Sequence, residues 1–100
     1  MVSQFDPPES LIQAALGQSS KNYGVVAENF FRRFQKYGGI QPSHRILDVG
    51  CGCGRMAVPL TRFLTTGSYE GFDVSREAVT WCQENITPHF PAFRFQWVDV

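Results

Sequence analysis

Apolar residues recur at helical spacing in the first 40 or so residues of the chain. A run that starts at Asp6, a suitable N-cap, and stops at Gly17 predicts a first helix. A second helix is predicted over residues 24–37, closed by the glycines that follow. Its expected buried stripe consists of Val26, Phe30, Phe34 and Tyr37. We therefore expect residues 1–43 to form an N-terminal helical segment.

The pattern changes at about residue 44, where short apolar runs begin to alternate with helical stretches. The runs predict buried strands over residues 45–49, 69–73 and 93–98. Residues 55–66 and a segment capped by Ser75 predict the helices between them, and Pro59 is expected to kink the first of these or delay its regular start. Strands that alternate with helices indicate an α/β fold, the first β-α-β-α-β half of a Rossmann-like parallel sheet.

Composition narrows the class of protein without naming a function. Apolar residues make up 43% of the 100 residues, enough for a packed core. Nine basic residues balance nine acidic ones, and no basic cluster suggests nucleic acid or an anionic membrane as a partner. The start of the chain has no signal-peptide pattern, and no apolar stretch is long enough to span a bilayer. With an odd number of cysteines, three, a reduced, cytoplasmic location is expected.

The strongest chemical signal is the glycine-rich segment 48–54, Asp-Val-Gly-Cys-Gly-Cys-Gly, between a predicted strand and a predicted helix. Gly50 allows a tight turn out of the strand, Gly52 lets a ligand approach the backbone, and Gly54 permits close packing of helix and strand. The dinucleotide fingerprint G-x-G-x-x-G would place its third glycine one residue later. The spacing therefore favours a ligand other than a pyrophosphate.

Acidic residues follow the next two predicted strands. Asp73 lies 19 residues beyond Gly54, and its two carboxylate oxygens suit the two hydroxyls of a ribose. Asp99 stands at the end of the third strand. Because parallel strands end at one edge of a sheet, these side chains are expected to line one site.

This combination resembles the class I S-adenosylmethionine-dependent methyltransferases over residues 44–100. The loop 48–54 resembles their first motif, and Gly-Phe-Asp-Val-Ser at 71–75 resembles their second. The resemblance implies S-adenosylmethionine as cofactor and methyl transfer as reaction. The sheets of such enzymes have more strands than three, so we expect the domain to be truncated, marginally stable and inactive alone.

The resemblance also implies roles for single residues at the cofactor site. Asp48 would contact the methionine amino group through water, while Gly50, Cys51 and Gly52 line the tail and the sulfonium. Asp73 would hold the ribose, and Val74 would lie against the adenine. Asp99 would accept from the adenine amino group, with the amide of Val100 on the ring.

Plainer interpretations stay open for each of these residues. The glycines can form a mere tight turn, or belong to an NAD(P)-dependent oxidoreductase or flavin protein with a variant fingerprint. Asp48 can bond amides of its own loop, while Asp73 and Asp99 can be turn or cap residues. A non-catalytic scaffold or regulatory protein that keeps the cofactor fold is a further alternative.

Other candidate groups point to ordinary packing. Cys51, Cys53 and Cys82 do not supply four tetrahedral ligands, so no metal site is expected. Three aromatic residues of the N-terminal segment suit either a lid over the sulfonium or helix packing, and packing is favoured: Tyr23, Phe30 and Phe31.

The neutral charge and the many aromatics favour a small-molecule acceptor. No catalytic residue and no oligomeric state can be assigned.

Overall fold

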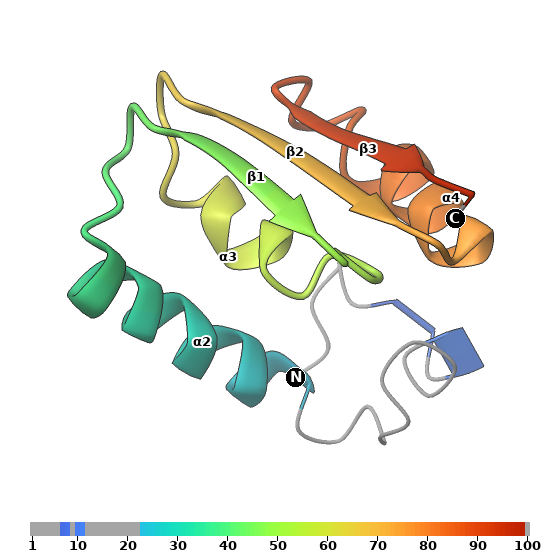
Figure 1. Cartoon of the computed structure of the whole chain (residues 1–100), viewed down its shortest axis with the longest axis horizontal. Helices are drawn as coiled ribbons and strands as arrows, with labels where there is room; N and C mark the ends of the chain where they lie inside the picture. Colours follow the sequence, from blue (N-terminus) through green and yellow to red (C-terminus); the bar gives the residue numbers. More distant parts are fainter. Residues whose placement is uncertain (1–6, 9, 12–22, 100) are drawn as a thin grey trace.

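The computed structural model describes residues 7–8, 10–11 and 23–99. Within them a helix precedes an alternation of strands and helices (Figure 1). The elements are α2 (Tyr23–Gly38), β1 (Arg45–Val49), α3 (Ala57–Thr61), β2 (Ser68–Asp73), α4 (Arg76–Asn85) and β3 (Phe93–Trp97). The predicted order is confirmed, and the three strands begin and end within one residue of their expected limits. Most of the first predicted helix lies outside the described residues.

The strands form one parallel sheet in the order β1-β2-β3, and Figure 1 shows their arrows pointing the same way. In the register, Asp48 lies opposite Gly71, and Asp73 lies opposite Trp97. The carboxyl ends of the strands therefore meet at one edge. This is the α/β Rossmann-like arrangement that the sequence predicted.

The core lies between the sheet and the helices that cover one of its faces. Tyr69 is completely buried there, and its ring stacks on Phe93 with 5.2 Å between centroids. On the opposite face of β1, Leu47 and Val49 are exposed. In the part of the chain that the structure describes, no strand pairs with the outer edge of β1.

The helix predicted over residues 55–66 is shorter than expected. Regular α3 covers only Ala57–Thr61, flanked by turns. Pro59 lies in the first turn of α3, where a missing amide hydrogen is tolerated, and the regular helix begins at Ala57, later than residue 55, as the predicted delay implies. After Pro59, the amides of Arg62 and Phe63 bond to carbonyls only three residues back, which tightens the chain into a turn.

Of the predicted buried stripe of α2, Val26 is half-buried, but the other three members are exposed. Phe30, Phe34 and Tyr37 are 39%, 46% and 77% exposed. The helix instead turns Ala27 and Phe31 inward, and Phe31 meets Phe63 edge-on with 5.4 Å between ring centroids. Spacing along a helix gives the angle between side chains, but only tertiary contacts choose which face is covered.

Candidate functional site

The glycine-rich loop leaves the end of β1 and turns sharply back across β2. Gly50 has a φ of 82°, a left-handed conformation that favours glycine. The amides of Gly50 and Cys51 both donate to the carbonyl of Phe72, at 2.8 and 2.9 Å. The predicted tight turn is confirmed, and the loop is anchored to the end of the neighbouring strand.

Gly54 packs against α4 more closely than any side chain would allow. A Cβ at this position would lie 2.9 Å from Cδ1 of Ile86 and 3.4 Å from Sγ of Cys82, and φ is 90°. The close contact at Gly54 therefore joins the loop to Cys82 and Ile86 of α4 and its C-cap, and not a helix to a strand as the sequence predicted. At Gly52, by contrast, a Cβ would meet nothing within 4 Å.

Asp73 joins three parts of the site through its carboxylate. Oδ2 accepts from the amide of Gly52 at 2.9 Å, and Oδ1 accepts from the amide of Ser75 at 2.8 Å. Ser75 in turn caps α4, as predicted, because its hydroxyl accepts from the amide of Ala78. The bond from Ser75, two residues further on, agrees with the plainer interpretation of Asp73 as a turn residue. An ionised carboxylate offers about four acceptor positions, so about two remain for a ligand.

Asp48 is bound by a residue that the sequence interpretation missed. The hydroxyl of Tyr69 donates to Oδ2 of Asp48 at 2.7 Å, although the two residues lie 21 positions apart. Burial, above all, raises the pKa of the Tyr69 phenol, and the nearby Asp48 charge raises it further. The hydroxyl therefore remains a donor. Only the strand register brings this pair together, and an isolated tyrosine in a strand carries no signal of it.

The ends of β2 and β3 are joined beside Val74. The amide of Val98 donates to the carbonyl of Asp73, and the indole Nε1 of Trp97 donates to the carbonyl of Val74, both at 3.0 Å. The side chain of Val74 is 63% exposed. Asp99, two residues past β3, is also exposed. Val100 lies outside the described residues.

The guanidinium of Arg76 stacks over Trp97, with 4.2 Å from its carbon to the ring centroid. Its charge therefore sits beside the end of β3 at the rim of the site.

Cys51 and Cys82 are buried cysteines that form no disulfide. Cys51 points beneath the loop, where a Cβ at Gly71 would meet its side chain at 2.8 Å, so a ligand above the loop would meet its backbone. Burial raises the pKa of the Cys51 thiol to about 12, with Asp48 and Asp73 adding to the effect. Cys82 shows an upward pKa shift for the same first reason, burial. Among the described residues, no group of three or more His, Cys, Asp or Glu side chains is placed to hold a metal.

The aromatic residues considered for a lid make different contacts in the structure. Phe31 belongs to the packing against Phe63, whereas Phe30 lies under the guanidinium of Arg55, 4.8 Å from ring centroid to carbon. The Tyr23 side chain is outside the described part. Ordinary packing, the favoured interpretation, therefore holds for Phe31.

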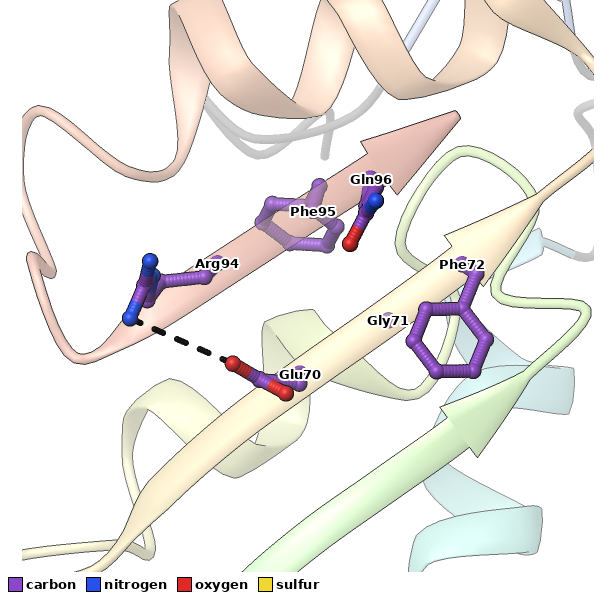
Figure 2. A pocket seen from close by; sticks show the side chains of 6 residues that line it. All are labelled: Glu70, Gly71, Phe72, Arg94, Phe95 and Gln96. Atoms are coloured by element: carbon purple, nitrogen blue, oxygen red, sulfur yellow. Dashed lines mark ion pairs between the residues drawn. The ribbon is translucent and has the colours of Figure 1, made fainter. Parts of the chain in front are cut away.

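Hollows border the sheet in several places. One of about 90 Å³ lies along β1 and is mainly apolar, lined by Phe34, Ile40, Ile46, Leu47, Asp48, Met56 and Leu60. Another, of about 250 Å³, lies over β2 and β3, where Glu70 forms an ion pair with Arg94 (Figure 2). Of these, only the first includes a predicted site residue, Asp48. None of the helices in the described ranges is long and apolar enough to cross a membrane.

Comparison with known proteins gives a consistent family. A family model described as a methyltransferase domain matches residues 46–100. The probable cobalt-precorrin-6B C(15)-methyltransferase (decarboxylating) of Thermoplasma acidophilum is 40% identical over 47 residues, 46% of this chain and 23% of that protein. The chain thus spans about a quarter of this curated relative.

Solved structures share the fold. Coclaurine N-methyltransferase bound to N-methylheliamine and SAH is similar with a TM-score of 0.62 and 16% identity, over 82% of this chain and 23% of that one. A SAM-dependent methyltransferase from Aquifex aeolicus gives a TM-score of 0.57 and 20% identity, over 94% of this chain and 47% of that one. At these identities the likeness concerns the fold.

Proposed function

The chain belongs to the methyltransferase domain family, and from this premise we propose that the protein transfers a methyl group from S-adenosylmethionine to a small-molecule acceptor. One observation carries the proposal. Asp73 lies between Gly52, where there is open space above the backbone, and the exposed Val74, and its carboxylate has acceptor positions that the two backbone amides do not use. Asp73 suits a ribose, the open backbone at Gly52 suits the amino-acid tail, and Val74 suits an adenine.

The residues of the site fit this cofactor by their chemistry. Two acceptor positions of Asp73 match the two hydroxyls of a ribose. The exposed side chain of Val74 offers apolar surface to an adenine, and Asp99 lies exposed beyond β3 to accept from its amino group. Asp48 offers a carboxylate to the ammonium group of the amino-acid tail. Gly50, Cys51 and Gly52 would line that tail with their backbone.

The chemistry that the cofactor supplies is an activated methyl group on a sulfonium. A lone pair of the acceptor forms the new bond to the methyl carbon while the carbon–sulfur bond breaks, and its electron pair stays on the sulfur of S-adenosylhomocysteine. The protein contributes chiefly by holding both reactants in line. None of the described residues is assigned as a base for the acceptor.

A small-molecule acceptor is supported by charge and by relatives. The chain has no net charge and no basic cluster to bind a nucleic-acid backbone. The T. acidophilum relative is described as acting on a cobalt-precorrin, and the coclaurine enzyme was crystallised with N-methylheliamine. Both are small molecules. The buried cysteines Cys51 and Cys82, which form no disulfide, support the cytoplasmic location that we include in the proposal.

The test is calorimetric titration of the full chain with S-adenosylhomocysteine, with NAD as competitor. We expect binding that NAD does not displace. Displacement by NAD would favour the oxidoreductase alternative, and no binding to a folded chain would overturn the proposal. Turnover is then measured with methyl-labelled S-adenosylmethionine and a cell extract. Label in the small-molecule fraction supports the acceptor class, and label in RNA or protein contradicts it. A chain that binds the ligand but transfers no label would fit the expectation that this half of the domain is inactive alone.

A further inference from the structure

Tyr69 combines complete burial with a polar contact in the candidate site. Its ring packs between Phe93 and Phe95 of β3, with 5.2 and 5.4 Å between centroids. Its hydroxyl emerges from this apolar setting and donates to Asp48 at 2.7 Å. A buried hydroxyl needs a hydrogen-bond partner. Here that partner is Asp48, a predicted site residue near the end of β1.

The sheet is built to let this hydroxyl reach Asp48. Asp48 lies opposite Gly71 in the register, and Tyr69 lies two residues before Gly71 on the same face of β2. A Cβ at Gly71 would stand 2.8 Å from the Tyr69 oxygen and 2.8 Å from Cβ of Cys51. The missing side chain at position 71 therefore leaves the space that the phenol crosses beneath the loop.

The contact has a directional consequence for Asp48. A protonated phenol facing a carboxylate can only donate, so Oδ2 is held by Tyr69. Oδ1 has no hydrogen bond from Tyr69 and stays available for another donor. A carboxylate tied at one oxygen keeps its orientation, as outer groups do for ligands of other sites.

We propose that Tyr69 is a positioning residue for the amino-acid end of the cofactor: its hydroxyl orients the Asp48 carboxylate so that Oδ1 faces the ammonium group, directly or across a water molecule. This inference rests on the proposed function. The proposed role concerns only the amino-acid tail of the cofactor. The nucleoside would be bound at the other end of the site, by Asp73, Val74 and Asp99.

The test compares two ligands in the full chain. S-adenosylhomocysteine carries the amino-acid tail, and 5′-methylthioadenosine has the same nucleoside and sulfur without it. Tyr69→Phe keeps the ring and removes the hydroxyl. We expect it to weaken S-adenosylhomocysteine about tenfold, the effect of one hydrogen bond to a charged group, and to change 5′-methylthioadenosine less than about twofold.

A double-mutant cycle shows whether Tyr69 acts through Asp48. In the Asp48→Ala background, Tyr69→Phe should cause no further loss of S-adenosylhomocysteine affinity, because the carboxylate that it orients is gone. Thr87→Val is the matched control. It removes another side-chain hydroxyl bond, from Thr87 to the carbonyl of Phe93, in the turn that follows α4. Thr87→Val should lower stability and leave both affinities unchanged.

The outcomes separate this inference from the proposed function. A wild-type chain that binds neither ligand overturns both. A wild-type chain that binds both, with Tyr69→Phe weakening the two ligands equally or neither, overturns only the role of Tyr69. Additive losses in the double mutant would do the same.

If Tyr69→Phe does not fold, the orientation is tested on Asp48 alone. In Asp48→Asn, the Tyr69 hydroxyl would donate to the amide oxygen of the new side chain. The NH₂ group of that side chain would then face the ammonium group of the ligand, which it cannot bind. Asp48→Asn should then bind S-adenosylhomocysteine no better than Asp48→Ala. Clearly tighter binding by Asp48→Asn would overturn the inference.

Discussion

The amide of Gly52 donates to Oδ2 of Asp73 across 2.9 Å, which ties the glycine-rich loop to the end of the neighbouring strand. The same carboxylate holds the amide of Ser75 at the start of α4. Asp73 therefore organises the site before any ligand arrives. A residue with both tasks should affect stability and binding together.

Asp73→Ala should lower both cofactor affinity and stability. Two backbone amides lose a charged acceptor, at a cost of about 1–3 kcal/mol in unfolding free energy. The affinity for S-adenosylhomocysteine should fall at least about tenfold by calorimetry. Glu70→Ala, on the same strand but exposed in its pair with Arg94, is the control and should change neither quantity appreciably. Equal effects of the two substitutions would refute the role given to Asp73.

Gly54→Ala should destabilise the fold. The added Cβ would press on Ile86 at 2.9 Å and would sit at a φ of 90°, and overpacking with backbone strain costs about 2–4 kcal/mol. Urea unfolding followed by circular dichroism measures the change. Gly24→Ala is the matched substitution, since nothing lies within 4 Å of a Cβ there, and it should be neutral or slightly stabilising. A Gly54→Ala protein as stable as Gly24→Ala would show that the side chain of Ile86 moves aside at little cost, and would contradict this prediction.

Ser75→Ala should destabilise α4 through its first turn. The hydroxyl of Ser75 accepts from the amide of Ala78, and losing such a cap costs about 1 kcal/mol. Thermal unfolding measures the loss, and Ser75→Asp, which can also cap, should restore most of it. Failure of the aspartate to restore stability would mean that the hydroxyl acts by another contact.

Alkaline pH should destabilise the fold through the Cys51 thiol. Its pKa is raised from 9.0 to about 12, so the folded protein holds the proton more tightly than the unfolded chain does. The associated stability is complete below pH 9 and is lost as the pH rises toward 12. Each such thiol contributes a fall of up to about 1.4 kcal/mol per pH unit in this window.

Urea unfolding at pH 8 and at pH 10.5 measures this loss. Cys51→Ala should reduce the difference between the two values, while part of it remains because burial also raises the pKa of Cys82. An unchanged difference in Cys51→Ala would contradict the assignment to this thiol.

The sequence by itself determined the elements whose causes are local. Residues 45–49 form a strand with the predicted limits, Gly50 makes the expected turn, and Ser75 caps α4. Each depends on apolar periodicity, on the freedom of glycine or on a side chain three residues from its partner. Family motifs in the loop 48–54 and at 71–75 pointed to the methyltransferase domain that the comparison then found.

Only the tertiary structure decided which distant residues meet. The bonds from Tyr69 to Asp48 and from Gly52 to Asp73 each span 21 positions, and they exist because the register places Asp48 opposite Gly71. The direction of α2 was likewise decided by the contact of Phe31 with Phe63, against the stripe that its spacing favoured. Periodicity determines which side chains share a face, while the packing of whole elements determines what that face touches.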